Sequence, residues 1–240
     1  MRSLLHKIKT EANAVQYFFK ILTISNQRRY AIPWWRSRKP GYLIASSMPW
    51  ICFDAIIFLN DCLRTKNNLR IFEYGSGGST FYWLLFDVKL VSIEHDISWF
   101  TMVKEKLNTR MIKNVDYRYV EPEYVNENWW KERDPSDPLQ YSTGDETLKN
   151  YKFRNYVNQI DQFPDGYFDL IMIDGRSRPA CITHSIKKVK QGGLLIIDNT
   201  EIDYYFQKTA SYLEAFDRKI FFGIVPTLTH MSRTDIFLAK

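Results

Sequence analysis

Short apolar runs alternate with amphipathic stretches from residue 69 onward. The amphipathic stretches have helical periodicity near residues 79–86, 97–109, 145–161, 178–190 and 201–215. Alternation of strands and helices predicts a parallel sheet with helices on both faces. Five apolar runs are the candidate parallel strands: Leu69–Tyr74, Val88–Ile93, Val115–Val120, Phe168–Ile173 and Gly193–Ile197.

The chain ends in two further strand candidates, Lys219–Val225 and Thr234–Ala239. The loop between them leaves no room for a crossover helix, so we expect these strands to pair antiparallel. The predicted fold class is therefore α/β. It is a Rossmann-like, doubly wound, mostly parallel seven-stranded sheet with an antiparallel last strand.

The first 68 residues lack the strand–helix alternation and predict a helical extension before a domain at 69–240. A second helix is expected from near Pro49 to Leu63. The first helix carries a narrow apolar stripe, which either docks on the protein's own core or lies in a membrane interface. The stripe consists of Leu4, Leu5, Ile8, Ala12, Val15, Phe19 and Leu22.

The positive charge of the chain is concentrated near its N-terminus. The net charge is +6, yet residues 1–40 contain nine Lys or Arg and one acid, Glu11. A basic arm of this kind suits a membrane surface, a nucleic acid or an acidic partner. Three cysteines and no CxxC pair exclude a disulfide scaffold and fit a reducing compartment. We expect a cytoplasmic protein of one domain, with peripheral membrane contact through the arm and the option of homo-oligomers.

Residues 121–150 break the alternation. This insert contains three prolines, four large aromatic residues and eight acids against three bases. Long connections without regular structure are usually lids or binding loops. Because the insert is acidic, it disfavours a phosphate backbone, and we expect no nucleic-acid substrate. Carboxylates and the tryptophans at 129 and 130 suit a sugar instead.

A glycine-rich turn follows the first predicted strand, in Glu73-Tyr74-Gly75-Ser76-Gly77-Gly78-Ser79-Thr80. Glycines allow a sharp turn and a close approach to a ligand, and the next helix begins with free N–H groups. Acids flank the turn: Glu73 precedes it, and Glu94 ends the second strand. An acid before the glycines suits a cationic amine, and an acid at the second strand suits ribose hydroxyls.

These motifs resemble those of the class I S-adenosylmethionine-dependent methyltransferases, with Ser79 at the position of the final motif glycine. The resemblance covers about residues 69–240. It implies that Glu73, Gly75, Ser76 and Gly77 meet the methionine part of S-adenosylmethionine and that Glu94 binds its ribose. Ser79, Thr80 and His95 flank these motifs and complete the predicted cofactor site.

Asp174 ends the fourth predicted strand, and Asp198 and Asn199 end the fifth. Three such oxygen ligands at one sheet edge predict a site for Mg²⁺ or Mn²⁺. The arrangement resembles that of the catechol and caffeoyl-CoA O-methyltransferases, except that Ser177 stands where they carry a lysine. The alternative is that Asp174 and Asp198 bind substrate or transfer protons. His184 is a second candidate base.

The string Asp174-Gly175-Arg176-Ser177-Arg178 through Cys181 also resembles bacterial methyltransferases associated with glycan biosynthesis. The sequence therefore predicts methyl transfer from S-adenosylmethionine to an oxygen acceptor, such as a sugar hydroxyl. Two alternatives remain open: a nicotinamide-dependent oxidoreductase, and a non-enzymatic binding protein associated with a membrane or nucleic acid.

Overall fold

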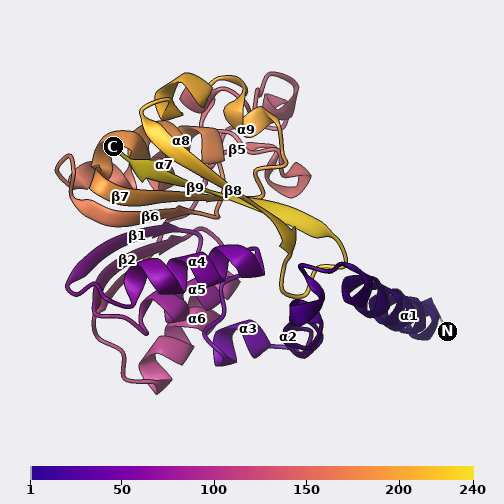
Figure 1. Ribbon diagram of the computed structural model, residues 1–240. Coiled ribbons are helices and arrows are strands. Elements are labelled where there is room, and N and C mark those ends of the chain that lie inside the picture. The colour runs from indigo at the N-terminus through magenta and orange to yellow at the C-terminus, as the bar shows by residue number, and fades with distance from the viewer. Residues whose placement is uncertain (1) are drawn as a thin grey trace.

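A single seven-stranded sheet runs through the protein in a computed structural model, which describes residues 2–240 and the side chains from residue 10 onward (Figure 1). The strand order is β3-β2-β1-β6-β7-β9-β8, and only β9 runs antiparallel to its neighbours. The predicted fold class is confirmed. The strands are β1 (Leu69–Tyr74), β2 (Val88–Glu94), β3 (Val115–Tyr119), β6 (Phe168–Ile173), β7 (Val189–Asp198), β8 (Phe216–Ile224) and β9 (Met231–Ala239).

Helices cover both faces of the sheet because successive residues of a buried strand point to opposite sides. Ile71 packs in one core with the helices before and after β1, whereas Phe72 packs in the other with the helices flanking β6. The first face carries α4 (Phe53–Leu63), α5 (Gly78–Trp83) and α6 (Ile97–Thr109). The second carries α7 (Arg154–Val157), α8 (Arg178–Ser185) and α9 (Tyr204–Gln207) (Figure 1).

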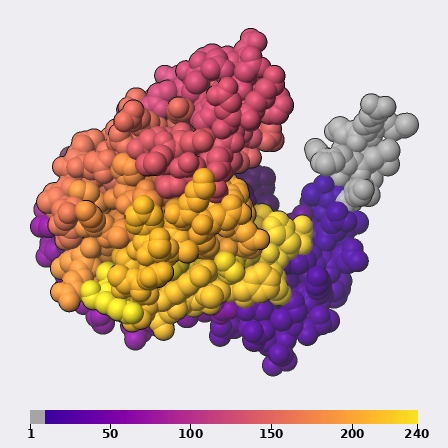
Figure 2. All heavy atoms as spheres, turned by 90° about the horizontal axis from the view of Figure 1, so that it is seen from above, coloured from indigo at the N-terminus to yellow at the C-terminus, as the bar shows by residue number. Residues whose placement is uncertain are grey.

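The N-terminal segment forms α1 (Arg2–Thr23), a 3₁₀ turn at Arg28–Tyr30, α2 (Ala31–Ser37) and α3 (Tyr42–Ala45). It packs against the hairpin of β8 and β9, and α1 stands out from the body of the molecule (Figures 1 and 2). Helix α4 lies within the predicted extension, but its buried Ala55, Leu59 and Leu63 belong to the core of the sheet, while Phe53 packs with the N-terminal segment. No helix in the described part of the chain is long and apolar enough to cross a membrane.

The insert at 121–150 is tied together at its base by a small antiparallel ladder between β4 (Glu123–Tyr124) and β5 (Tyr151–Lys152). Short 3₁₀ turns at Trp129–Lys131, Pro138–Gln140 and Glu146–Leu148 fill the space between. The single helix predicted for 145–161 is therefore wrong. Tyr151 pairs with Tyr124 in the ladder. Residues 145–161 therefore form a 3₁₀ turn, the strand β5, the short helix α7 and a second 3₁₀ turn.

Candidate functional site

The largest cavity of the candidate site lies at the carboxyl edge of the sheet, where β1, β2, β6 and β7 end. Ligands of open α/β sheets bind at this edge. Its volume is about 440 Å³, which is within the range of small-molecule sites. This first cavity is lined by Trp50, Gly75, Ser76, Glu94, His95, Trp99, Asp174, Gly175, Arg176, Arg178, Asp198, Asn199 and Leu228.

Gly75 shapes the floor of the first cavity. Its φ is 88°, and a Cβ there would lie 3.0 Å from the backbone of Asp174. Only glycine combines this backbone conformation with so close an approach. The turn therefore brings the ends of β1 and β6 together at the first cavity, which Gly75 and Ser76 line. Gly77, a predicted cofactor residue, does not line this cavity and lies against the ring of Trp99. Thr80 accepts a hydrogen bond from Gly77 N at 2.9 Å and caps α5.

Glu94 faces the first cavity from the end of β2. Its Oε1 accepts hydrogen bonds from the backbone N–H groups of His95 and Asp96, at 2.7 and 2.9 Å. Its Oε2 accepts from the N–H and hydroxyl of Ser76, at 3.1 and 3.0 Å. Burial raises the pKa of Glu94, but these donors and His95 outweigh burial and hold the pKa below its ordinary value. An ionised carboxylate here suits a pair of hydroxyl donors.

Glu73 is fully buried behind the glycine-rich turn and does not line the first cavity, which corrects its predicted contact with the cofactor amine. Its carboxylate accepts from Thr80 Oγ1 and Ser92 Oγ, both at 2.6 Å, and from Trp83 Nε1 at 3.0 Å. Burial is the largest influence and raises the pKa of Glu73 to about 7. Because the folded pKa is the higher one, this group's contribution to stability is present at acid pH and is lost as pH rises through about 7.

Replacement of Glu73 by alanine is expected to lower the free energy of unfolding by about 3 kcal/mol or more, since three buried donors lose their acceptor at about 1–3 kcal/mol each. Urea denaturation at acid pH measures the loss. The exposed Glu105→Ala exchange on α6 is the control and should leave stability unchanged. An E73A protein as stable as the parent would show that Glu73 does not organise the turn.

Arg178 lies where the sequence predicts a divalent cation. Its Nη2 donates to Asp174 Oδ1 at 2.9 Å, and its Nη1 donates to Asn199 Oδ1 at 2.9 Å and to the Asp198 carbonyl. Its Nε donates to the Gly175 carbonyl at 3.1 Å. The guanidinium is buried, and it is the cation that Asp174 and Asn199 contact.

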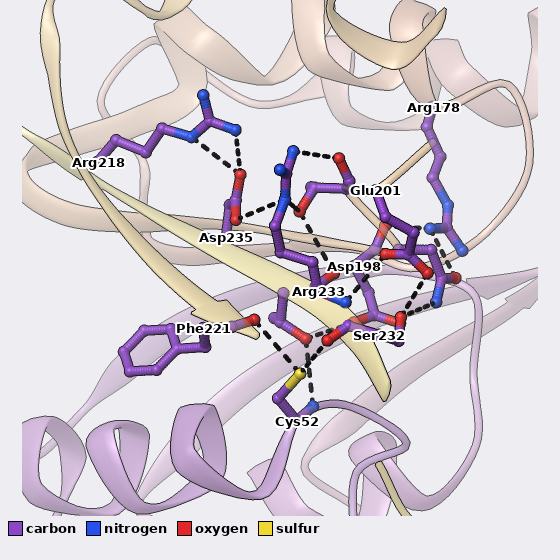
Figure 3. A network of polar contacts seen from close by, with 12 residues as sticks. Cys52, Arg178, Asp198, Glu201, Arg218, Phe221, Ser232, Arg233 and Asp235 are labelled. Atoms are coloured by element: carbon purple, nitrogen blue, oxygen red, sulfur yellow. Dashed lines mark hydrogen bonds and ion pairs between the residues drawn. The ribbon is translucent and has the colours of Figure 1, made fainter. Parts of the chain in front are cut away.

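The side chain of Asp198 contacts β9, and its pKa is raised by burial and by the nearby carboxylate of Asp174. Its Oδ1 accepts from the Thr234 hydroxyl at 2.5 Å, and Thr234 in turn accepts from the backbone N–H of Cys52 at 3.2 Å. Asn199 Nδ2 donates to Ser232 Oγ at 3.2 Å. Figure 3 shows this network running from Arg178 through Asp198 to the cysteine. Both predicted ligands after β7 are therefore anchored by β9.

The donor set does not fit the predicted metal ion. Arg178 already donates to one oxygen of Asp174 and to the amide oxygen of Asn199, and Thr234 donates to one oxygen of Asp198. Among the residues the structure describes, no group of three His, Cys, Asp or Glu side chains is arranged to hold a metal ion. The prediction of Mg²⁺ or Mn²⁺ at Asp174, Asp198 and Asn199 is corrected to a cation supplied by the chain itself.

Asp174 retains a free oxygen toward the first cavity. Within the described part of the chain, its side chain accepts a hydrogen bond only at Oδ1. Burial raises the pKa of Asp174 above its ordinary value, although Arg178 and Arg176 lower it in part. A carboxylate with a raised pKa and an unused oxygen has the properties of a general base.

A second cavity of about 320 Å³ adjoins the first and shares four residues with it: Gly175, Arg176, Arg178 and Asn199. The insert closes one side, where Asp145 forms an ion pair with Arg176 at 3.1 Å. Helix α9 and the turn before it close the other. The remaining lining residues are Thr143, Gly144, Asp145, Ser177, Ile202, Tyr204 and Tyr205.

Several predicted site residues lie elsewhere. His184 is on the outer side of α8, where its Nδ1 lies 2.8 Å from Asp161, and it lines neither cavity. Its predicted role as a base is therefore corrected. Ser79 and Thr80 are buried in the first turn of α5 and act on the turn rather than in the cavity. His95 does line the first cavity, with its Nδ1 2.9 Å from Glu94.

The aromatic walls of the first cavity are Trp50 and Trp99, which the sequence analysis missed. Trp99 Nε1 donates to the Ser76 carbonyl at 2.7 Å, so its ring is fixed against the glycine-rich turn. The available signal was Asp96, which caps α6 and places Trp99 in its first turn, beside the site. Trp129 and Trp130 line neither cavity, and Trp129 is buried beneath Lys152.

Similar proteins were found by structure and not by sequence. No protein-family model and no curated protein matches the sequence. A protein from Klebsiella pneumoniae assigned as an O-methyltransferase has a similar structure, with a TM-score of 0.54 and 17% identity over 79% of this chain and 81% of that one. The O-methyltransferase from Bacillus cereus, solved in complex with SAH, is also similar. Its TM-score is 0.52, with 16% identity over 82% of this chain and 87% of that one.

At such low identity the likeness is one of fold. The chain has the fold of the class I S-adenosylmethionine-dependent methyltransferases, as the resemblance in the glycine-rich turn predicted, and among them it resembles O-methyltransferases.

Proposed function

We propose that this protein transfers a methyl group from S-adenosylmethionine to an oxygen acceptor, and that the acceptor is a sugar hydroxyl. The observation that carries the proposal is the pair of adjoining cavities, with Arg178 between them and its partner Asp174 in the wall of the first. The first cavity suits the cofactor, and the second suits the acceptor.

Each part of the cofactor has a suitable partner among the residues that line the first cavity. Glu94 would offer an ionised carboxylate to the ribose hydroxyls, and the backbone of Gly75 and Ser76 would face the methionine part. The rings of Trp50 and Trp99 supply apolar wall for the adenine. In this arrangement Asp174, which lines the same cavity, would lie on the side of the methyl group.

The chemistry requires alignment and removal of one proton. The acceptor hydroxyl donates to the free oxygen of Asp174 as its own oxygen attacks the methyl carbon. As the O–C bond forms, the C–S bond breaks and its electron pair stays on sulfur, which becomes a neutral thioether. The hydroxyl proton passes to Asp174 and then to solvent.

Arg178 supports this step as a fixed cation. A guanidinium has five N–H donors, and four of them are used by Gly175, Asp198, Asn199 and Asp174. The fifth is on Nη2, beside the carboxylate. It can donate to the acceptor oxygen and stabilise the negative charge that develops there.

The lining of the second cavity favours a hydroxyl-rich acceptor. Hydroxyl groups come from Thr143, Ser177 and Tyr204, and a carboxylate comes from Asp145. Such groups exchange hydrogen bonds with sugar hydroxyls, and the aromatic rings of Tyr204 and Tyr205 offer apolar surface to a sugar face.

Calorimetry with S-adenosylhomocysteine, NAD and S-adenosylmethionine tests the cofactor. Binding of both adenosyl compounds without binding of NAD supports the proposal. Binding of NAD alone would reject it and favour an oxidoreductase. Transfer of labelled methyl to a panel of free sugars and glycans then tests the acceptor class.

Methyl transfer should proceed at an unchanged rate in the presence of EDTA, because Arg178 supplies the cation at Asp174 and Asn199. The measurement is the initial rate with labelled S-adenosylmethionine after dialysis against chelator, with and without added Mg²⁺ or Mn²⁺. Loss of activity in EDTA and its return with metal would contradict the role of Arg178.

A further inference from the structure

An unpartnered apolar face covers one side of the N-terminal segment. We define it by Val15, Phe18, Phe19 and Leu22 of α1 with Ile32 and Trp35 of α2. Phe19 and Ile32 are each 61% exposed, and Val15, Leu22 and Trp35 are each more than 40% exposed. The residues enclose a shallow groove of about 350 Å³ beside Arg36. Large contiguous apolar patches mark sites of association.

The opposite face of α1 already has its partner within the chain. Ala14, Tyr17 and Ile21 are buried against Tyr30, Trp34 and their neighbours. The helix is thus held in place by its own chain, and its second apolar face is left over. That second face follows the stripe predicted from sequence at Ala12, Val15, Phe19 and Leu22. Leu4, Leu5 and Ile8 lie outside the side chains that the structure describes.

The segment that carries the apolar face is rich in basic residues, and one of them, Arg36, lines the groove. Residues 10–40 contain six Lys or Arg and one acid, Glu11, which is paired with Arg38 at 2.9 Å. Lys20, Arg28, Arg36 and Lys39 are exposed at the surface of the segment. Helix α1, which carries most of the face, extends away from the sheet-bearing body (Figure 1).

We propose that this apolar face docks on the surface of an anionic lipid membrane. An amphipathic helix with aromatic residues on one side and basic residues around them is suited to lie in the plane of such a surface. Trp35 matches the preference of tryptophan for the boundary between headgroups and hydrocarbon. Each basic side chain near anionic lipid adds to the attraction.

Charge distinguishes a membrane from a second copy of the chain. A twofold dimer through this face would bring two copies of the same basic segment together, and the like charges would repel. Anionic headgroups neutralise them instead. The proposal is independent of the proposed methyl transfer, because no residue of the face lines either cavity of the candidate site.

Co-sedimentation of the full chain with vesicles tests the proposal. We expect binding to vesicles of phosphatidylcholine mixed with phosphatidylglycerol, much weaker binding to pure phosphatidylcholine, and release as salt rises. Point variants are preferable to deletion of α1, because deletion would expose Tyr30 and Trp34, which α1 covers.

Phe19→Glu and Ile32→Glu are each expected to weaken vesicle binding by about tenfold or more, since each removes apolar contact and adds a negative charge. The matched control is Leu139→Glu, which places the same charge on a residue that is 80% exposed in the insert. Its binding should equal that of the parent. Circular dichroism and binding of S-adenosylhomocysteine confirm that each variant is folded.

Two outcomes overturn the proposal. One is that the parent chain stays in the supernatant with anionic vesicles, or that F19E and I32E sediment as strongly as the parent. The other is a dimer in light scattering that F19E and I32E dissociate while vesicle binding is absent, which would assign the face to a second copy of the chain. Retained binding of S-adenosylhomocysteine in either case leaves the proposed function standing.

Discussion

Replacing Asp174 with asparagine is expected to reduce the rate of methyl transfer by about 10²–10⁴-fold, which is the usual contribution of a general base. Asparagine keeps the oxygen that accepts from Arg178 but cannot take a proton. Binding of S-adenosylhomocysteine should therefore stay within a factor of a few of the parent, so that the loss falls on kcat. Single-turnover rates and calorimetry separate the two quantities.

Asp161→Asn is the matched control for this experiment. Asp161 contacts α8 through His184 but lies outside both cavities, so D161N should retain the parental rate. The parent's rate should also rise with pH through the raised pKa of Asp174, because the base acts only when deprotonated. A D174N rate near that of the parent would remove Asp174 from the mechanism.

Glu94→Gln is expected to weaken binding of S-adenosylhomocysteine by about 100-fold or more. Two hydroxyl contacts to a charged acceptor contribute about 1.5–3 kcal/mol each, and glutamine removes the charge and one acceptor oxygen. The expected effect is on affinity, since Glu94 lines the first cavity and is the proposed ligand of the ribose. Calorimetry gives the dissociation constant directly.

The control for Glu94 is Asp116→Asn on the neighbouring strand β3, an exposed carboxylate paired with Arg118. D116N should bind as the parent does. Thermal unfolding must accompany both measurements, because Glu94 also holds the N–H groups of Ser76, His95 and Asp96. Unchanged affinity in a folded E94Q protein would show that the ribose binds elsewhere.

The sheet was predictable because its signal is local. Each buried strand is a short apolar run, and each is bounded by polar turns that the alternation makes visible. The insert was less predictable, because the ladder that joins Tyr124 to Tyr151 depends on two residues far apart in sequence. Propensity alone favoured a helix through Tyr151, and tertiary pairing overrode it.

For the candidate site, too, the local features were predictable and the tertiary contacts were not. Strand ends placed Glu94 and Asp174 correctly, because parallel strands bring their carboxyl ends to one edge. The directions of side chains were not predictable from position. Glu73 points into the core with Trp83 rather than toward the ligand, and Asp198 points toward Thr234. Arg178 lies four residues after Asp174, and the helical turn that brings the two together becomes visible only once α8 is placed.

The hairpin of β8 and β9 has a consequence for the order in which the protein folds. Trp34 Nε1 donates to the Leu228 carbonyl at 2.6 Å, and Gln27 and Ser37 accept from Ile224 and Thr227, across separations of 190 or more residues. Contacts of such long range form late and slowly. Because Leu228 also lines the first cavity, the loop that contacts α2 forms part of the wall of that cavity. A ribosome-bound chain that has not yet released β9 therefore has neither a finished cavity nor a positioned N-terminal segment.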